Sequence, residues 1–338
     1  MHRNLVGVMA LLVVAHTAAL GQSASVSLDS AMHEAERNGF SGVVRVEKNG
    51  VVLLERGYGM ANRATKIAFT PATIVQIGSN TKDFTAVAIL QLVEDRKISL
   101  ADSIGRFFRS APADKRNITI TQLLTHRAGF PLGIGDDFEV LNRQQLVDRA
   151  MTTPLLFVPG ARENYSNTGY SLLAAIVEQI AGTSYDVYLR DRILTPLGLT
   201  RTGLLLPGFR APDLAHGYLL TGADAGTMLA KPHAADGPYW NLRGNGGMLS
   251  TVGEMQVFYK ALLETDKLMK PATRALRFNP DEPIGLAGSD GVNFFLYERF
   301  PRRRTEILIA STNAAFKAPA IRRILVKMLS LPDPDGGE

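Results

Sequence analysis

The sequence predicts an α+β or α/β fold: an antiparallel sheet built from both chain ends, flanked by helices, with an inserted and mainly helical region. Strand-like segments occur towards both termini, whereas helical periodicity dominates the residues between them. The chain has 338 residues, 46% of them hydrophobic, which is enough to bury one large core. We expect residues 22–75 and 244–338 to form the sheet region, residues 76–243 to form the helical region, and a cleft to lie between them in a single unit.

Residues 1–21 are predicted to be a signal peptide rather than part of the fold. Arg3 provides a positive start, residues 5–20 contain no Asp, Glu, Lys or Arg, and Ala19-Leu20-Gly21 supplies small residues for cleavage. The apolar run is shorter than the about 20 residues that a membrane-spanning helix needs. We therefore expect an exported protein, periplasmic or secreted, with no membrane span after cleavage.

The first part of the sheet region is expected to contain a helix followed by a hairpin. Residues 29–38 have a helical pattern that ends before Gly39. Residues 42–47 and 51–56 are strand-like, and the Asn49-Gly50 pair between them is typical of a tight hairpin turn.

The inserted region is expected to be built on two main helices. Residues 81–94 are apolar nearly all round, which is typical of a helix buried in a core. Residues 170–181 carry one apolar stripe at helical spacing, and Gly182 follows where a helix would end. Shorter helices are predicted over residues 118–125 and 184–194, and long loops over residues 200–243.

The second part of the sheet region begins with a predicted helix over residues 251–263, because Thr251 and Glu254 form a capping-box pattern. Residues 294–299 and 306–312 are strand-like, and the basic run at residues 302–304 is expected in the turn between them. Residues 321–331 are predicted to form a terminal helix.

Composition excludes several function classes. The chain has no cysteine, which removes disulfides, thiolate nucleophiles and zinc–thiolate sites. Its formal charge of +5 is mild, and no basic cluster is interleaved with aromatic residues, so we expect no nucleic-acid binding. His33-Glu34 lacks the second histidine of a zinc-protease helix, and the glycines of residues 244–247 lack the Lys-Ser/Thr ending of a phosphate loop. We expect no metal and no cofactor.

Ser79-Asn80-Thr81-Lys82 is the first candidate for chemistry. On a helix, Ser79 and Lys82 stand at i and i+3 and share one face. A lysine whose pKa is lowered by burial can take the serine proton, or can orient the group that takes it. Unpaired backbone N–H groups at the helix start can hold an oxyanion. The pattern alone is weak, because Ser-x-x-Lys arises by chance roughly once in a chain of this length.

Tyr165-Ser166-Asn167 is the second candidate. A tyrosine near a lysine ammonium group has its phenolate favoured and could act as a general base. The amide of Asn167 could hydrogen-bond both the lysine and a substrate carbonyl. A turn with a buried tyrosine ring is the alternative interpretation.

Together with their surroundings, these motifs resemble the serine β-lactamase and penicillin-binding-protein superfamily, particularly its class C-like branch of esterases, D,D-peptidases and D-aminopeptidases. The matching segments are residues 73–82, 98–104, 118–129, 159–170, 194–200 and 246–251. The resemblance implies a β-lactamase/transpeptidase-like fold, with Ser79 as the acylated nucleophile and Lys82 helping to deprotonate it. It implies Tyr165 as base and then acid, and Asn167 as the residue that positions Lys82 and the substrate.

The family's third motif, Lys-Thr-Gly or His-x-Gly on the strand beside the site, corresponds here to residues 286–288. Gly288 is kept, and the N–H of Ser289 could complete the oxyanion hole, but Leu286 replaces the cation. The lead-in from 271 to 285 is also shorter than in the family. Two other arginines could supply the missing charge from elsewhere: Arg243 and Arg299.

We therefore predict an exported serine hydrolase of small esters, amides or peptides, with esterase activity favoured over β-lactamase or D,D-peptidase activity. The alternatives are a β-lactamase or D,D-peptidase with a substituted third motif, and a non-catalytic envelope binding module that keeps the fold. His126 suggests a triad with Ser79, but in the resembling family it belongs to a packing turn. Nothing in the sequence indicates an oligomeric state.

Overall fold

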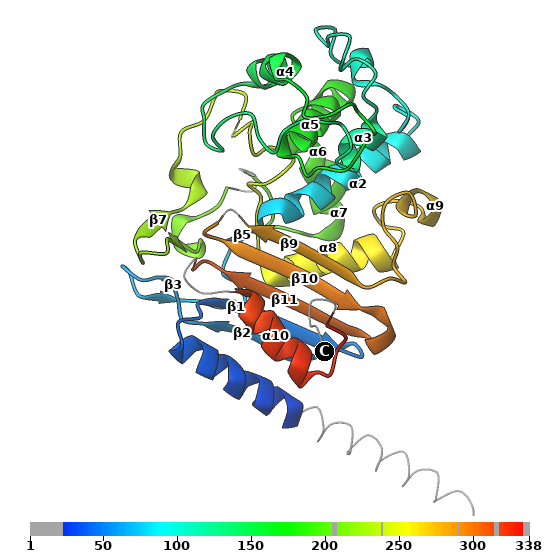
Figure 1. Ribbon diagram of the computed structural model, residues 1–338. Coiled ribbons are helices and arrows are strands. Elements are labelled where there is room, and N and C mark those ends of the chain that lie inside the picture. The colour runs from blue at the N-terminus through cyan, green and yellow to red at the C-terminus, as the bar shows by residue number, and fades with distance from the viewer. Residues whose placement is uncertain (1–22, 205–207, 238, 290, 314–317, 334–338) are drawn as a thin grey trace, which may run out of the picture.

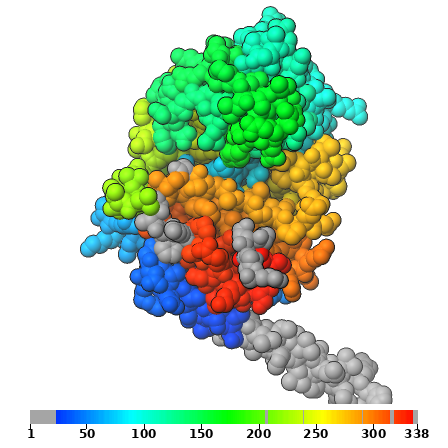
Figure 2. Space-filling model, in the orientation of Figure 1, coloured from blue at the N-terminus to red at the C-terminus, as the bar shows by residue number. Residues whose placement is uncertain are grey.

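The computed structural model describes residues 23–204, 208–237, 239–289, 291–313 and 318–333, so the predicted signal peptide lies outside the described residues. The described chain forms a sheet region and a helical region stacked on each other (Figure 1). Figure 2 shows the two regions closely packed, with the orange segment that contains β9 and β10 along the boundary. Among the described residues, no helix has the length and apolar character needed to cross a bilayer.

The main sheet has five antiparallel strands in the order β2-β1-β11-β10-β9. The strands are β1 (Gly42–Lys48), β2 (Val51–Tyr58), β9 (Ile284–Ser289), β10 (Phe294–Phe300) and β11 (Thr305–Ser311). Asn49 and Gly50 join β1 to β2 with φ values of 54° and 78°, as the hairpin pattern predicts. Val44 of β1 lies opposite Ile309 of β11. Both chain ends therefore build one sheet, which confirms the predicted fold class.

Two helices cover one face of this sheet. They are residues 23–37 and α10 (Ala318–Met328), and they pack against alternate residues of β1 such as Val44 and Val46. Val43, on the opposite face, belongs to the core shared with the helical region. Both helices include residues before their predicted starts at 29 and 321, among them the buried Leu28 and Ala318.

The helical region is centred on α2 (Thr81–Glu94), whose first twelve residues are all buried, as its apolar sequence predicts. α5 (Asn167–Ala181) ends at Gly182, which has a φ of 69°. It begins three residues before the predicted start, because the Ser166 side chain accepts the Gly169 N–H and caps the helix. The other helices are α3 (Ile120–Leu124), α4 (Arg143–Thr152), α6 (Tyr185–Leu189) and α7 (Thr195–Leu197), with a π-helical turn at Arg190–Leu194.

Helix α4 was not predicted from the sequence. This helix begins with a capping box in which Asn142 and Gln145 satisfy each other's backbone N–H groups. The residues between 200 and 243 that the structure describes hold only short elements, as predicted. These are β6 (Gly217–Tyr218), β7 (Asp224–Gly226) and the single turns Ala211–Asp213 and Met228–Ala230.

The junction of the two regions positions the site. β5 (Val75–Gln76) pairs with β8 (Leu249–Ser250), close to both predicted boundaries of the insertion, although the division of the chain at those boundaries stays a prediction. α8 (Val252–Glu264) lies between the sheet and α2, and the rings of Phe84 and Phe258 stack with centroids 3.8 Å apart. The remaining elements are β3 (Met60–Asn62), β4 (Ile67–Ala68), α9 (Pro271–Arg274) and the single turns Gly78–Asn80 (η1), Ile104–Arg106 and Pro301–Arg303.

Candidate active site

Ser79 lies in η1, a single 3₁₀ turn that leads directly into α2. Lys82 follows in the first turn of α2, and its Nζ is 3.1 Å from Ser79 Oγ. The two side chains therefore share one face, as the i, i+3 spacing predicts. Because the first N–H groups of a helical segment have no acceptor within the helix, the Ser79 N–H is available to a ligand.

Lys82 is buried and makes two further polar contacts, to Asn167 Oδ1 at 2.8 Å and to the Asn245 carbonyl at 2.7 Å. Burial lowers the pKa of Lys82 to about 7, and the nearby charges of Asp83 and Asp137 only partly oppose this. A neutral amine has two N–H donors and one lone pair. The ammonium form donates to Ser79 Oγ, whereas the neutral form, with its two donors on Asn167 and Asn245, can turn its lone pair to the Ser79 hydroxyl as a proton acceptor must.

Tyr165 approaches the same hydroxyl from another side, with its OH 2.7 Å from Ser79 Oγ. Lys82 Nζ lies 4.7 Å from the centroid of the Tyr165 ring. Burial nevertheless raises the pKa of Tyr165, although its hydrogen bond with Ser79 has the opposite effect. Tyr165 is therefore protonated near neutral pH and donates to Ser79, so the expectation that the ammonium favours a phenolate does not hold in this state.

His126 supports Tyr165 rather than contacting Ser79. Its ring lies against that of Tyr165, with centroids 4.6 Å apart, and its Nδ1 accepts the Ser166 N–H at 3.2 Å. Burial, assisted by the positive charges of Lys82 and Arg277, lowers the pKa of His126 to about 4, so the ring is neutral. The geometry favours the packing turn over a Ser79–His126 triad.

Asn167 is brought to the site by the start of α5. As the first residue of that helix, its backbone N–H donates to the Leu132 carbonyl at 2.7 Å, while its side chain reaches Lys82. The Ser166 cap fixes the start of α5 between Tyr165, which contacts Ser79, and Asn167, which contacts Lys82.

Asn245 was missed by the sequence analysis as a contact of Lys82, because its contribution is a backbone carbonyl. Its side chain anchors the glycine-rich loop by donating to Ser171 Oγ and to the Asn241 carbonyl. Thr85 of α2 donates to the neighbouring Gly244 carbonyl at 2.6 Å. The Gly-Asn-Gly-Gly pattern of this loop indicates a tight turn, but it does not indicate that the loop contacts Lys82.

Strand β9 touches η1 through two glycines. A Cβ atom on Gly288 would lie 2.2 Å from the Ile77 carbonyl oxygen and 2.5 Å from the Ser79 nitrogen. A Cβ atom on Gly78, whose φ is 51°, would lie 2.8 Å from the Ser289 nitrogen. No larger side chain fits at either position without moving the backbone. The contact brings the backbone nitrogens of Ser79 and Ser289 to one junction beside the serine hydroxyl.

The N-terminal end of α2 is held by a buried series of hydrogen bonds. The Asn80 side chain donates to Tyr259 OH at 2.7 Å, and that hydroxyl donates to Asp83 Oδ2 at 2.8 Å. Burial raises the pKa of Asp83 to about 6, against the opposing hydrogen bond from Tyr259. These hydrogen bonds connect α2, which carries Lys82, to α8, and so hold the first turn of α2 in place.

Leu286 brings no charge to β9 and packs against the main hydrophobic core. Neither arginine suggested by the sequence replaces the missing cation. Arg243 is fully buried and paired with Glu178 at 2.9 Å, and Arg299 is paired with Glu264 at 2.9 Å. Arg299 also lies opposite Ile284, at the far end of β9 from Ser289. Ion pairs with acidic residues distant in sequence hold both side chains away from the site. The sequence does not reveal these pairings.

Arg277, another residue missed in the sequence, reaches the edge of the site instead. It lies between α9 and β9, and its Nη2 is 3.4 Å from Tyr170 OH. The one feature of the sequence that pointed to Arg277 was its position in the short segment that leads into β9.

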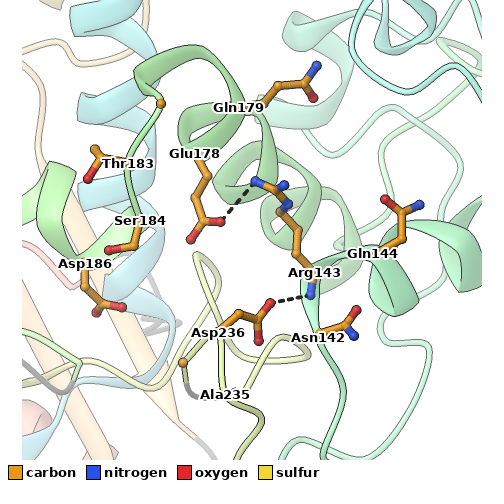
Figure 3. Close-up of a pocket in the computed structure, with 12 residues that line it drawn as sticks. Asn142, Arg143, Gln144, Glu178, Gln179, Thr183, Ser184, Asp186, Ala235 and Asp236 are labelled. Atoms are coloured by element: carbon orange, nitrogen blue, oxygen red, sulfur yellow. Dashed lines mark hydrogen bonds and ion pairs between the residues drawn. The ribbon is translucent and has the colours of Figure 1, made fainter.

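A separate surface hollow of about 1120 Å³ lies near the start of α4 and the end of α5. In Figure 3, the Arg143 side chain points to Glu178, while the Arg143 backbone N–H bonds to Asp236. None of the predicted site residues lines this hollow.

Comparisons with known proteins show the family and the fold of the chain. A family model described as Beta-lactamase matches residues 28–302. Protein flp of Staphylococcus aureus (strain COL) is 33% identical over 209 residues, covering 59% of this chain and 42% of flp. The putative penicillin-binding protein PbpX of Bacillus subtilis is 28% identical over 258 residues, covering 76% of this chain and 62% of PbpX. The chain thus spans less than two thirds of the length of these curated relatives.

Solved structures show the same fold. The octameric penicillin-binding protein homologue from Pyrococcus abyssi has a TM-score of 0.75 at 26% identity, covering 90% of this chain and 77% of that one. A beta-lactamase/D-alanine carboxypeptidase from Pseudomonas syringae has a TM-score of 0.77 at 17% identity, covering 92% and 100%.

Proposed function

The chain belongs to the beta-lactamase family, and on that basis we propose that it is a serine hydrolase acting by acyl transfer through Ser79. One observation carries the proposal: a single hydroxyl contacts both a buried lysine of lowered pKa and a protonated tyrosine. The proton acceptor and the proton donor are thus each within hydrogen-bond reach of the nucleophile.

In the first step, the proton of the Ser79 hydroxyl passes to the neutral amine of Lys82, and Oγ bonds to the substrate carbonyl carbon. The carbonyl oxygen becomes an oxyanion, which the N–H groups of Ser79 and Ser289 would stabilise. Removing one such donor costs about 3 kcal/mol in known hydrolases. Asn167 keeps Lys82 in place and offers an amide to the substrate.

In the second step, the bond to the leaving group breaks and Tyr165 gives that group its proton. The ammonium of Lys82 then returns a proton to Tyr165, which restores the charge balance. Water next takes the place of the leaving group: it loses a proton to the same residues, attacks the acyl carbon and releases Ser79 with its proton.

Small esters or amides are the proposed substrates, with esters favoured. Penicillins, cephalosporins and D-Ala-D-Ala ends carry a carboxylate that the family's third motif recognises, and Leu286 cannot pair with it. A charged hydrogen bond contributes about 1.5–3 kcal/mol to binding. Its loss therefore weakens the binding of those substrates more than the binding of a neutral ester. Export through residues 1–21 is also part of the proposal.

A substrate panel tests this function. The full chain lacking residues 1–21 is assayed with p-nitrophenyl acetate, a chromogenic cephalosporin and a D-Ala-D-Ala peptide. We expect kcat/KM to be highest for the ester. Preference for the cephalosporin or the peptide would support a β-lactamase or D,D-peptidase with a substituted third motif. Turnover of none of them would support a non-catalytic binding module.

The pH dependence of ester hydrolysis follows from the role of Lys82. Because the neutral amine accepts the proton, kcat/KM should rise with pH through about 7, the pKa of Lys82, and then level off. The raised pKa of Tyr165 predicts no descending limb below about pH 10.

Asp83→Asn provides the control for this profile. The negative charge of Asp83 raises the pKa of Lys82, so its removal should move the ascending limb to lower pH. Asparagine still offers an oxygen to the Tyr259 hydroxyl. A profile that is flat between about pH 6 and pH 8 would show that Lys82 is not the proton acceptor.

A further inference from the structure

The two N–H groups proposed for the oxyanion come from segments that the sheet does not join. The Ser79 N–H belongs to η1, and the Ser289 N–H belongs to the last residue of β9. In the described sheet, β9 is an edge strand that pairs with β10. Among the described residues, no backbone hydrogen bond joins η1 to β9. Side chains must therefore contribute to holding the two N–H groups at a fixed separation.

The side chain of Asn80 makes such a contact. Its Nδ2 donates to the Leu286 carbonyl of β9 at 3.3 Å and to the Tyr259 hydroxyl of α8 at 2.7 Å. Asn80 is 2% exposed and directly follows Ser79, and Leu286 lies three residues before Ser289. One buried amide therefore connects the turn of the nucleophile to the strand that carries the second N–H.

The oxygen of the same amide has no hydrogen-bond donor. Asn80 Oδ1 is buried and unpaired, and a Cβ atom on Gly288 would lie 2.7 Å from it. A buried acceptor without a donor lowers stability. Such a departure from good packing is expected where a residue serves the site rather than the stability of the fold. The N–H groups of Asn80, and not its oxygen, account for the orientation of the amide.

Tyr259 fixes that orientation from α8. Its hydroxyl accepts from Asn80 and donates to Asp83 Oδ2 at 2.8 Å. Its ring stacks on that of Tyr297 in β10, with centroids 4.0 Å apart. Tyr297 in turn lies opposite Leu286 in the pairing of β10 with β9. The contacts therefore form a closed ring, from Asn80 through Tyr259 and the two strands back to Asn80.

We propose that Asn80, oriented by Tyr259, is a positioning residue for the oxyanion hole. Its amide holds β9 against η1, so that the N–H groups of Ser79 and Ser289 point to one substrate oxygen. This inference rests on the proposed acyl transfer through Ser79 and adds a role for two residues that do not touch the substrate. Because the two donors act on the charge that develops in the transition state, a small displacement of one donor slows the chemical step.

Asn80→Leu tests the amide with little change in shape. It removes the bond to the Leu286 carbonyl but leaves the Tyr259 hydroxyl bonded to Asp83. We expect kcat/KM for p-nitrophenyl acetate to fall by about tenfold to hundredfold. The Ki of 2,2,2-trifluoroacetophenone, which forms a tetrahedral adduct with a serine hydroxyl, should rise by a similar factor. The ascending limb of the pH profile should stay at about pH 7, because the contacts of Lys82 are unchanged.

Tyr259→Phe is the second variant, which keeps the ring stack and removes the hydroxyl. It should lower kcat/KM less than Asn80→Leu does, because the contact of Asn80 with β9 remains. Its ascending limb should move to lower pH. The hydrogen bond from Tyr259 lowers the pKa of Asp83, so its loss leaves less negative charge to raise the pKa of Lys82. An equal shift of the limb in Asn80→Leu would mean that Asn80 acts on Lys82, and would overturn the proposal.

Gln91→Leu is the matched control. Gln91 is a buried amide farther along α2, and its Nε2 donates to the Leu268 carbonyl at 3.0 Å. Its replacement should lower the melting temperature but keep kcat/KM and Ki close to those of the wild type. Unchanged kcat/KM in a folded Asn80→Leu would contradict the positioning role. Equal losses in the two variants would also contradict it, because they would show an effect of stability alone.

Hydrogen–deuterium exchange separates this inference from the proposed function, because it requires no catalysis. The amides of residues 284–289 should exchange faster in Asn80→Leu than in the wild type, whereas Gln91→Leu should leave their rates unchanged. Equal rates in all three proteins would show that Asn80 does not hold β9. Wild-type hydrolysis by Ser79→Ala would instead contradict acyl transfer through Ser79, and the exchange rates would still decide whether Asn80 holds the strand.

Discussion

Ser79→Ala is expected to lower kcat for p-nitrophenyl acetate by on the order of 10⁴-fold or more, because it removes the proposed nucleophile that forms the acyl-enzyme. The hydroxyl receives the hydrogen bond of Tyr165 at 2.7 Å and faces Lys82 at 3.1 Å. Without Oγ, both partners remain but have no nucleophile to activate. Steady-state kinetics over a range of enzyme concentrations measures the loss.

Ser41→Ala is the matched control for this variant. Ser41 is a buried serine whose hydroxyl donates to the Met60 carbonyl, away from the site. We expect near wild-type kcat for Ser41→Ala and similar melting temperatures for both variants. If Ser79→Ala retained most of the activity while remaining folded, Ser79 would not be the nucleophile.

Lys82→Met should lower kcat/KM for the same ester by about 10²- to 10⁴-fold, the range measured for loss of a general base. Methionine fills a similar volume but cannot accept the Ser79 proton. It also leaves the Asn167 side-chain oxygen and the Asn245 carbonyl without their lysine donor. The ascending limb of the pH profile near pH 7 should disappear together with the activity, since the titrating amine is absent.

Lys115→Met controls for the removal of a buried lysine. Lys115 is also buried and is paired with Asp114, in the segment before α3. Its replacement should leave kcat/KM and the pH profile close to those of the wild type. A Lys82→Met enzyme that kept both its activity and its ascending limb would assign the proton acceptor to another group.

The overall fold was predictable because its signals are local and agree with one another. The Asn49-Gly50 turn, the apolar residues of α2 and the Gly182 helix end all adopt the structure that their sequence favours. The ends of elements were less predictable. α5 begins at Asn167 rather than at Tyr170 because the Ser166 side chain caps it, and this cap brings Asn167 to Lys82.

The candidate site was predictable where neighbouring residues or known motifs define it, as for Ser79 with Lys82 and Tyr165 with Asn167. It was not predictable where segments distant in sequence meet. The Asn245 carbonyl bonds to Lys82 across 163 residues. The further rise in the pKa of Tyr165 comes from desolvation in the folded chain, which sequence spacing does not report.

Charged residues were the hardest to place. Arg243 and Arg299 are arginines like Arg277, and nothing in the sequence distinguishes them. What separates them is the presence of a nearby carboxylate in the folded chain, Glu178 for one and Glu264 for the other. Ion pairing in three dimensions, rather than position along the chain, decides where these two side chains lie.

Covalent labelling tests acyl transfer through Ser79 most directly. The chain is treated with a fluorophosphonate probe over a range of pH, and the site of the adduct is located by peptide mass spectrometry. We predict a single adduct on Ser79, formed at a rate that rises with pH through about 7, where Lys82 loses its proton. An adduct on another residue, or equal labelling of wild type and Ser79→Ala, would contradict the account.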